Sequence, residues 1–201
     1  MTENYIFDFG NVLTEFYPYK LTEPYVSDEE MKKRISQVVF HRECWDKLDA
    51  GTISNDEMKS FIKSNLSSDE ADIGCKVYDN WVSNLTPVKD MQQLIFDIHN
   101  SGKKLYLLSN ISIYFADNYH KVKWIKELFD CFDGIVLSGP VGKTKPNRDI
   151  FEYILDKYNL DARECLFIDD SNINIAGGEA LGIKGYLFDG DAKRLREYIG
   201  I

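Results

Sequence analysis

The stretch Ile6-Phe7-Asp8-Phe9-Gly10-Asn11-Val12-Leu13 joins a short apolar run to a segment that carries a carboxylate, a glycine and an asparagine. The run at residues 5–7 has the length of a strand and no alternation of polar and apolar residues. Such a run is typical of a strand buried on both faces of a parallel sheet. Open parallel sheets bind their ligands at the carboxyl ends of the strands. Asp8, the first polar residue after the run, is therefore a candidate functional residue.

Four more apolar runs of strand length follow, and helical patterns separate them. Because strands and helices alternate, the sequence predicts an α/β fold: a doubly wound parallel sheet with right-handed crossovers. The predicted strands cover residues 5–7, 105–108, 134–137, 166–168 and 184–188. The predicted helices cover residues 86–99, 114–129, 149–158, 173–181 and 192–198, the first of them opened by Thr86-Pro87.

The segment between the first two predicted strands departs from this rhythm. Only helical patterns occur in it, at residues 28–40 (capped by Ser27), 55–65 and 69–82. The segment is too long for an ordinary crossover. We therefore expect a small helical cap domain at residues 17–84 and an α/β core domain at residues 1–16 and 85–201. Trp81, which has apolar neighbours at helical spacing, is expected in the core.

Composition limits the classes of function. The net charge of −9 leaves no basic surplus to neutralise nucleic-acid phosphates, so a nucleic-acid partner is not expected. The N-terminal residues enter the first strand without a basic segment or a long apolar run, so we expect a cytoplasmic protein with no membrane span. The cysteines are widely spaced and form no CxxC pair, which indicates reduced thiols: Cys44, Cys75, Cys131 and Cys165.

Polar side chains follow four of the predicted strands at their carboxyl ends: Asp8, Ser109, Asn110, Lys145, Asp169 and Asp170. Each alone has an ordinary explanation as a cap, a turn or a surface lysine, but together they form a set. Three neighbouring carboxylates repel one another unless a divalent cation joins them, and an all-oxygen site suits Mg²⁺. The hydroxyl, the amide and the lysine suit a phosphoryl group. Asp8 is then available as a nucleophile that forms an acyl-phosphate.

Four segments carry a family resemblance over nearly the whole chain: residues 6–13, Leu107-Leu108-Ser109-Asn110, Lys145-Pro146 and Phe167-Ile168-Asp169-Asp170-Ser171. In this order they resemble the four motifs of the haloacid dehalogenase superfamily. The helical segment after the first motif is similar to the helical cap of that superfamily. The resemblance implies a Rossmann-like core and a phosphatase whose nucleophile is Asp8, assisted by Lys145.

The resemblance also implies a ligand set. Mg²⁺ would be held by Asp8, the main-chain carbonyl of Gly10 and Asp170, with Asp169 close by. The phosphate of a small phosphorylated metabolite would be held by Ser109, Asn110 and Lys145. The opening around Asp8 and the stretch at residues 49–54 resemble the bacterial α-D-glucose-1-phosphate phosphatases, which favours a sugar phosphate as substrate.

One position departs from the family pattern. Many of these phosphatases carry a second aspartate two positions after the nucleophile, which protonates the leaving group, whereas this chain has Gly10. Glu15, Glu43 and Asp49 are acids that could substitute, but we expect a surface role for each. Without a general acid, the rate should depend steeply on the basicity of the leaving group.

Two other functions remain open at this point. An L-2-haloacid dehalogenase also uses an aspartate nucleophile and expels a halide without an acid, although the Asp169-Asp170 pair would then have no metal to hold. A catalytically weak protein that binds a phosphorylated metabolite would also tolerate Gly10. The sequence leaves the oligomeric state open.

Overall fold

The computed structural model describes residues 2–201, and a five-stranded parallel sheet lies at its centre. Its strand order is β5-β4-β1-β6-β7, so the first strand of the chain lies in the middle. All five predicted strands are present: β1 (Asn4–Phe7), β4 (Lys104–Ser109), β5 (Gly134–Leu137), β6 (Cys165–Asp169) and β7 (Lys184–Leu187).

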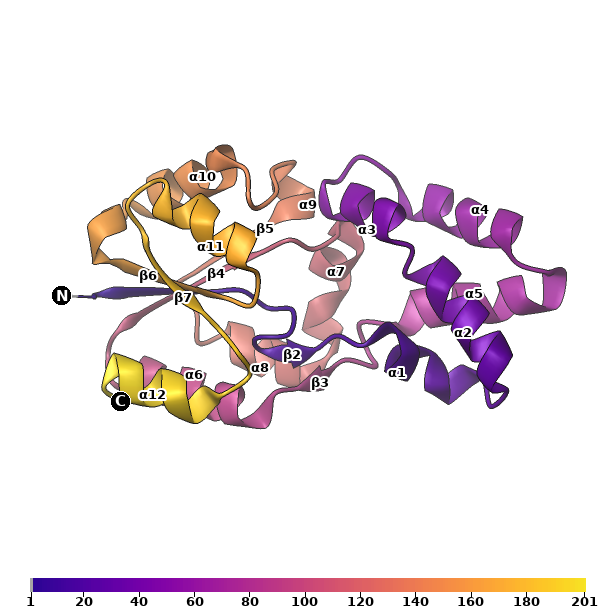
Figure 1. Ribbon diagram of the computed structural model, residues 1–201, viewed down its shortest axis with the longest axis horizontal. Helices are drawn as coiled ribbons and strands as arrows, with labels where there is room; N and C mark the ends of the chain where they lie inside the picture. The colour runs from indigo at the N-terminus through magenta and orange to yellow at the C-terminus, as the bar shows by residue number, and fades with distance from the viewer. Residues whose placement is uncertain (1) are drawn as a thin grey trace.

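Helices cover both faces of the sheet (Figure 1). One face is packed by α6 (Lys89–Asn100), α8 (Lys123–Phe129) and α12 (Ala192–Ile199). The other is packed by α10 (Arg148–Tyr158) and α11 (Asn172–Glu179). The predicted doubly wound α/β fold is therefore confirmed.

The central strand β1 shows why its sequence lacks polar alternation. Tyr5 and Phe7 belong to the apolar cluster on the α6 side of the sheet, and Ile6 belongs to the cluster on the α10 side. Successive side chains of a strand point to opposite faces, and here both faces are dry. Asp8 is the first residue beyond this double packing, and its main-chain N–H still donates to the carbonyl of Ile168 at 2.9 Å.

A helical insert lies beyond the carboxyl ends of the strands (Figure 1). The chain leaves and re-enters the core through a two-stranded antiparallel ribbon of β2 (Thr14–Glu15) and β3 (Thr86–Pro87). Between them lie α1 (Pro18–Thr22), the 3₁₀ turn η1 (Glu23–Tyr25), α2 (Glu29–Val39), α3 (Arg42–Asp49), α4 (Asn55–Asn65) and α5 (Ser68–Asn80).

Aromatic side chains connect this insert to the core. The ring of Phe16 lies 5.4 Å from that of Trp45 and 5.9 Å from that of Trp81. Trp81 in turn stacks on Phe115 of the core at 5.8 Å and is 1% exposed, so its predicted core position is confirmed. The insert and the α6 face of the sheet therefore share one continuous apolar cluster.

Several local predictions were wrong. Thr86-Pro87 does not open a helix, because it pairs with β2, where Thr14 Oγ1 donates to the carbonyl of Thr86 at 2.9 Å; α6 begins at Lys89. The cap of α2 is Asp28 rather than Ser27, since the Asp28 carboxylate accepts from the N–H of Met31.

The helix predicted at residues 114–129 is interrupted. It consists of α7 (Ile113–Asn118), a 3₁₀ turn η2 (Tyr119–Lys121) and α8, and Val122 between the last two has an extended backbone. A short helix α9 (Ser138–Val141) and a 3₁₀ turn η3 (Ala162–Glu164) were not predicted. Across residues 2–201, no helix is long and apolar enough to cross a bilayer.

Candidate active site

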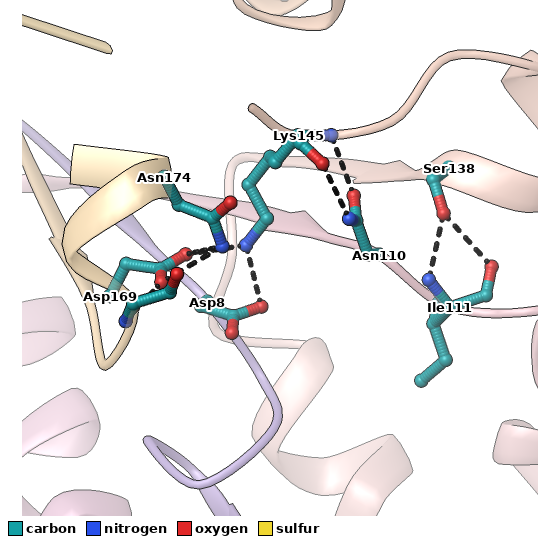
Figure 2. Close-up of polar contacts among 8 residues, drawn as sticks. Asp8, Asn110, Ile111, Ser138, Lys145, Asp169 and Asn174 are labelled. Atoms are coloured by element: carbon teal, nitrogen blue, oxygen red, sulfur yellow. Dashed lines mark hydrogen bonds and ion pairs between the residues drawn. The ribbon is translucent and has the colours of Figure 1, made fainter. Parts of the chain in front are cut away.

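A buried lysine bridges two aspartates at the carboxyl ends of the central strands (Figure 2). Lys145 Nζ lies 2.9 Å from Asp8 Oδ1 and 2.6 Å from Asp169 Oδ2. Lys145 is 4% exposed, Asp8 8% and Asp169 0%. Phe7 pairs with Ile168 in the sheet, so the parallel register itself places Asp8 beside Asp169.

Asp169 is the most fully bonded member of the group. Its carboxylate accepts hydrogen bonds from the N–H of Ser171 at 2.8 Å and from the amide of Asn174 at 3.1 and 3.2 Å (Figure 2). Together with Lys145, these donors compensate for the charge of a fully buried carboxylate. Because these donors already occupy the lone pairs of the Asp169 carboxylate, its role is to position the lysine.

Asp8, Asp169 and Asp170 each offer a carboxylate oxygen, and these oxygens lie within 4.8 Å of one another. Burial raises the pKa of Asp8 to about 6, although Lys145 opposes this shift. Burial and the neighbouring Asp169 raise the pKa of Asp170 as well. A cluster of oxygen donors whose negative charge is only partly neutralised fits a hard divalent cation such as Mg²⁺.

Burial works to lower the pKa of Lys145, but the carboxylates of Asp8 and Asp169 outweigh this effect and raise it. The side chain is therefore a permanent cation at the nucleophile. A fixed positive charge in a water-poor site stabilises a phosphoryl group more strongly than a lysine on the surface would.

The two residues predicted after β4 differ in surroundings. Ser109 ends the strand and is 2% exposed. The Asn110 side chain donates to the carbonyl of Lys145 at 2.9 Å and accepts from the N–H of Lys145 at 2.8 Å. Both polar ends of the Asn110 amide thus hold the main chain of Lys145 in place (Figure 2).

A pocket of about 150 Å³ opens beside this cluster, between the core and the insert. Gly10, Ser109 and Asn110 line its core side. Most of the remaining wall is apolar and aromatic, contributed by Phe9, Phe16, Trp45, Trp81, Leu85 and Ile111. A second hollow, next to it, shares Phe16, Trp45, Asp49 and Asn110 and leads past Arg42.

The three acids that could replace the missing general acid at position 10 lie in different surroundings. Glu15 lies in a different groove, where it pairs with Lys20 at 3.1 Å, and Glu43 is exposed on α3. Asp49, at the end of α3, lines the pocket, and its Oδ1 is buried. The surface role expected for Asp49 was therefore wrong, because the insert folds this helix end onto the core.

Two further residues, Ser138 and Asn174, support the site. Ser138, which is fully buried, donates to the carbonyl of Asp49 at 2.6 Å and accepts from the N–H of Ile111 at 2.7 Å. The Asn174 amide holds Asp169. Asn174 could be expected near the site from its place one helical turn after Asp170, whereas nothing marks Ser138 locally.

Comparison with known proteins agrees with this geometry. Residues 3–182 match the sequence model of the haloacid dehalogenase-like hydrolases. A sesquiterpene phosphatase of Aspergillus oryzae is 26% identical over 97% of this chain and 95% of its own length. A D-ribitol-5-phosphate phosphatase of Bacteroides thetaiotaomicron is 25% identical over 92% of this chain and 91% of its own length.

Among solved structures, a haloacid dehalogenase family enzyme of Bacteroides thetaiotaomicron, a mutant in complex with magnesium and inorganic phosphate, superposes with a TM-score of 0.74. The two sequences are 23% identical, and the match covers 97% of this chain and 99% of that one, so it supports the fold. Because the family match covers most of the chain, this protein is an enzyme, and it belongs to the haloacid dehalogenase-like hydrolases.

Proposed function

We propose that the protein is a magnesium-dependent phosphatase that hydrolyses a small phosphate monoester through an aspartyl-phosphate on Asp8. The observation that carries the proposal is the position of Asp8. Its carboxylate lies 2.9 Å from a buried lysine and belongs to a cluster of three acids, and the two residues that follow it, Phe9 and Gly10, line a pocket. Phosphatase activity also fits the relatives named above.

In this proposal Asp8 attacks phosphorus, the alcohol departs, and water then hydrolyses the acyl-phosphate to regenerate Asp8. Lys145 neutralises oxygens of the phosphoryl group, and Ser109 and the Asn110 main chain border the place where those oxygens would lie. Asp169 and Asn110 act through Lys145. Asp169 holds its side chain, and Asn110 holds its main chain.

Mg²⁺ would be held by Asp8, Asp170 and the main-chain carbonyl of Gly10, with Asp169 beside them. The ion would supply positive charge that offsets the repulsion between the carboxylates and the phosphate. Asp170 is the acid of this set with which Lys145 forms no ion pair, so the ammonium group does not already occupy its carboxylate.

Residues 17–84 act as a cap in this proposal, and the core consists of residues 1–16 and 85–201. The cap supplies Trp45, Asp49 and Trp81 to the pocket, so it contacts the part of the substrate beyond the phosphate. A cap of this kind excludes water and sets specificity. We expect changes in the stretch 41–54 to alter preference among substrates and to spare a small generic phosphate ester.

The substrate class follows from the pocket. A sugar phosphate is one candidate, since a volume of about 150 Å³ is enough for a single ring. A phosphate ester of a compact apolar alcohol is a second candidate, because most of the wall is aromatic or aliphatic and offers few partners for sugar hydroxyls. The sesquiterpene phosphatase relative points in the same direction.

The dehalogenase and the binding-protein alternatives fit less well. Displacement of a halide uses no cation, whereas Asp8, Asp169 and Asp170 form a cluster suited to one. A protein that only binds a metabolite has no need for a nucleophile held against a buried lysine.

The test is turnover of a phosphate ester panel by the purified protein, with and without Mg²⁺. We expect Asp8→Asn to retain its circular dichroism and to lose at least about 10³-fold in turnover, because the attacking oxygen is gone. Asp117→Asn, an exposed aspartate on α7, is the matched control. Full activity in excess chelator, or substantial activity of Asp8→Asn, would overturn the proposal. Relative kcat/KM for sugar and prenyl phosphates decides between the two substrate classes.

A further inference from the structure

Two buried side-chain polar atoms have no hydrogen-bond partner within residues 2–201, and both belong to residues of the same pocket. They are Asp49 Oδ1 and Trp81 Nε1. Buried polar atoms in folded proteins are nearly always paired, because an unpaired one costs about 1–3 kcal/mol. A buried acceptor and a buried donor left unpaired on two residues that the insert contributes to this pocket indicate that a polar atom of a ligand pairs with them.

The main chain of Asp49 is fixed to the core. Ser138 Oγ donates to its carbonyl at 2.6 Å. The next turn residue, Gly51, has φ +68°, and a Cβ at this position would overlap the carbonyl oxygen of Gly139. The end of α3 therefore rests directly on α9, with no side chain between Gly51 and Gly139. A carboxyl group attached to such a point is held in one place relative to the strand ends.

The space beside Gly10, two residues after the nucleophile, is open. A Cβ built at Gly10 would meet no atom within 4 Å, and Gly10 and Asp49 line the same pocket. This space begins two residues after Asp8, where the alcohol of a phosphate ester would leave. The chain carries no acid at position 10, but the insert contributes one to the wall of the same pocket.

We propose that Asp49 is the general acid of this enzyme and protonates the oxygen of the departing alcohol. The inference rests on the proposed phosphatase function of Asp8. As an oxygen of Asp8 bonds to phosphorus, the bond from phosphorus to the alcohol oxygen breaks. The electron pair left on that oxygen takes the proton of Asp49. In the second step the Asp49 carboxylate takes a proton from the water that attacks the aspartyl-phosphate, and both residues return to their initial states.

The electrostatic surroundings agree with this role. Burial, and then the neighbouring carboxylates Asp46 and Asp8, raise the pKa of Asp49 to about 7, against the opposing effect of Lys145 and Arg42. A carboxyl group with a pKa near neutrality holds its proton until the alcohol needs it, which is the property required of a general acid.

The experiment compares Asp49→Asn with the wild-type enzyme on two substrates that share the phosphoryl group. One is p-nitrophenyl phosphate, whose leaving group is a stable anion, and the other is a simple alkyl phosphate, whose leaving group needs a proton. Glu43→Gln, an exposed acid on the same helix, is the control. We expect Asp49→Asn to lower kcat/KM for the alkyl ester by about 10²–10⁴-fold and for the aryl ester by less than about 10-fold. Glu43→Gln should lower neither.

Equal losses on both esters in a folded Asp49→Asn variant would overturn the proposal, and so would no loss on either. A second measurement needs no variant: wild-type kcat/KM for the alkyl ester should fall as pH rises through about 7. The aryl ester should lack this fall, and equal profiles for both esters would also contradict the role of Asp49. If the enzyme hydrolyses the aryl ester and Asp8→Asn abolishes this activity, the phosphatase function is supported whatever the role of Asp49. The two proposals can therefore fail independently.

Discussion

Ser138 Oγ donates a 2.6 Å hydrogen bond to the main-chain carbonyl of Asp49, although 89 positions separate the two residues. The same hydroxyl accepts from the N–H of Ile111, directly after Asn110 (Figure 2). One buried side chain thus joins the end of α3 in the insert to the ends of two core strands. The position of the insert over the pocket depends on this contact.

Removing this hydroxyl should affect both stability and turnover. Ser138→Ala leaves the carbonyl of Asp49 and the N–H of Ile111 buried without their partner, and we expect a loss of about 1–3 kcal/mol in the free energy of unfolding. Ser60→Ala is the control, because Ser60 makes a similar 2.8 Å bond to a main-chain carbonyl but is exposed. Urea denaturation measures both variants. A cost no larger than that of Ser60→Ala would mean that the insert does not depend on this contact.

Asp169 should be required for stability as well as for activity. Asp169→Ala leaves the ammonium group of Lys145 buried with Asp8 as its single carboxylate partner, and loss of one member of a buried charge pair typically costs about 3–5 kcal/mol. Asp130→Ala breaks an ion pair of the same 2.6 Å length on the surface of α8, and such pairs contribute about 0–1 kcal/mol. Equal thermal shifts for the two variants would contradict a buried charge network at the site.

The ionisation of Asp49 should make stability depend on pH. Its pKa is about 7 in the folded protein and near 4 in an unfolded chain. The protonated group therefore stabilises the fold fully below pH 4, and this contribution disappears as pH rises through 7. Asp49→Asn has no such group, so relative to the wild type it should gain stability between pH 4 and pH 8, by at most about 4 kcal/mol. Melting temperatures across this range test the expectation. A difference that stays constant across this range would mean that Asp49 titrates normally.

The sequence predicted the sheet well because its signal is local. The central strands of this doubly wound sheet are apolar on both faces, so the runs around Phe7 and Phe167 are recognisable without knowledge of their partners. The site residues at the strand ends follow from the same logic, since the parallel register brings Asp8 and Asp169 together. Helix boundaries were less accurate where a tertiary contact decides the backbone, as in the β2–β3 ribbon at Thr86.

The pocket wall could not be predicted in the same way. Asp49 lies near the middle of the insert, and whether its carboxyl group faces solvent or the active site depends on how α3 is placed on the core. That placement is set by Ser138 and by the approach of Gly51 to Gly139. None of these residues carries a sequence pattern that relates it to another, so an exposed position was the reasonable expectation for an acid near the end of a helix.

An acid introduced at position 10 should restore the general-acid function that the Asp49→Asn variant lacks. A Cβ at Gly10 meets no atom within 4 Å, and its φ is outside the left-handed region, so an aspartate should fit there without strain. In the Asp49→Asn background we expect Gly10→Asp to recover at least about 10-fold in kcat/KM for an alkyl phosphate, because a positioned acid is typically worth about 10²–10⁴-fold. Gly10→Asn in the same background has nearly the same size but no proton to give, and should recover nothing. Recovery by both variants would attribute the effect to filled space rather than proton transfer, and recovery by neither would place the leaving oxygen out of reach of residue 10.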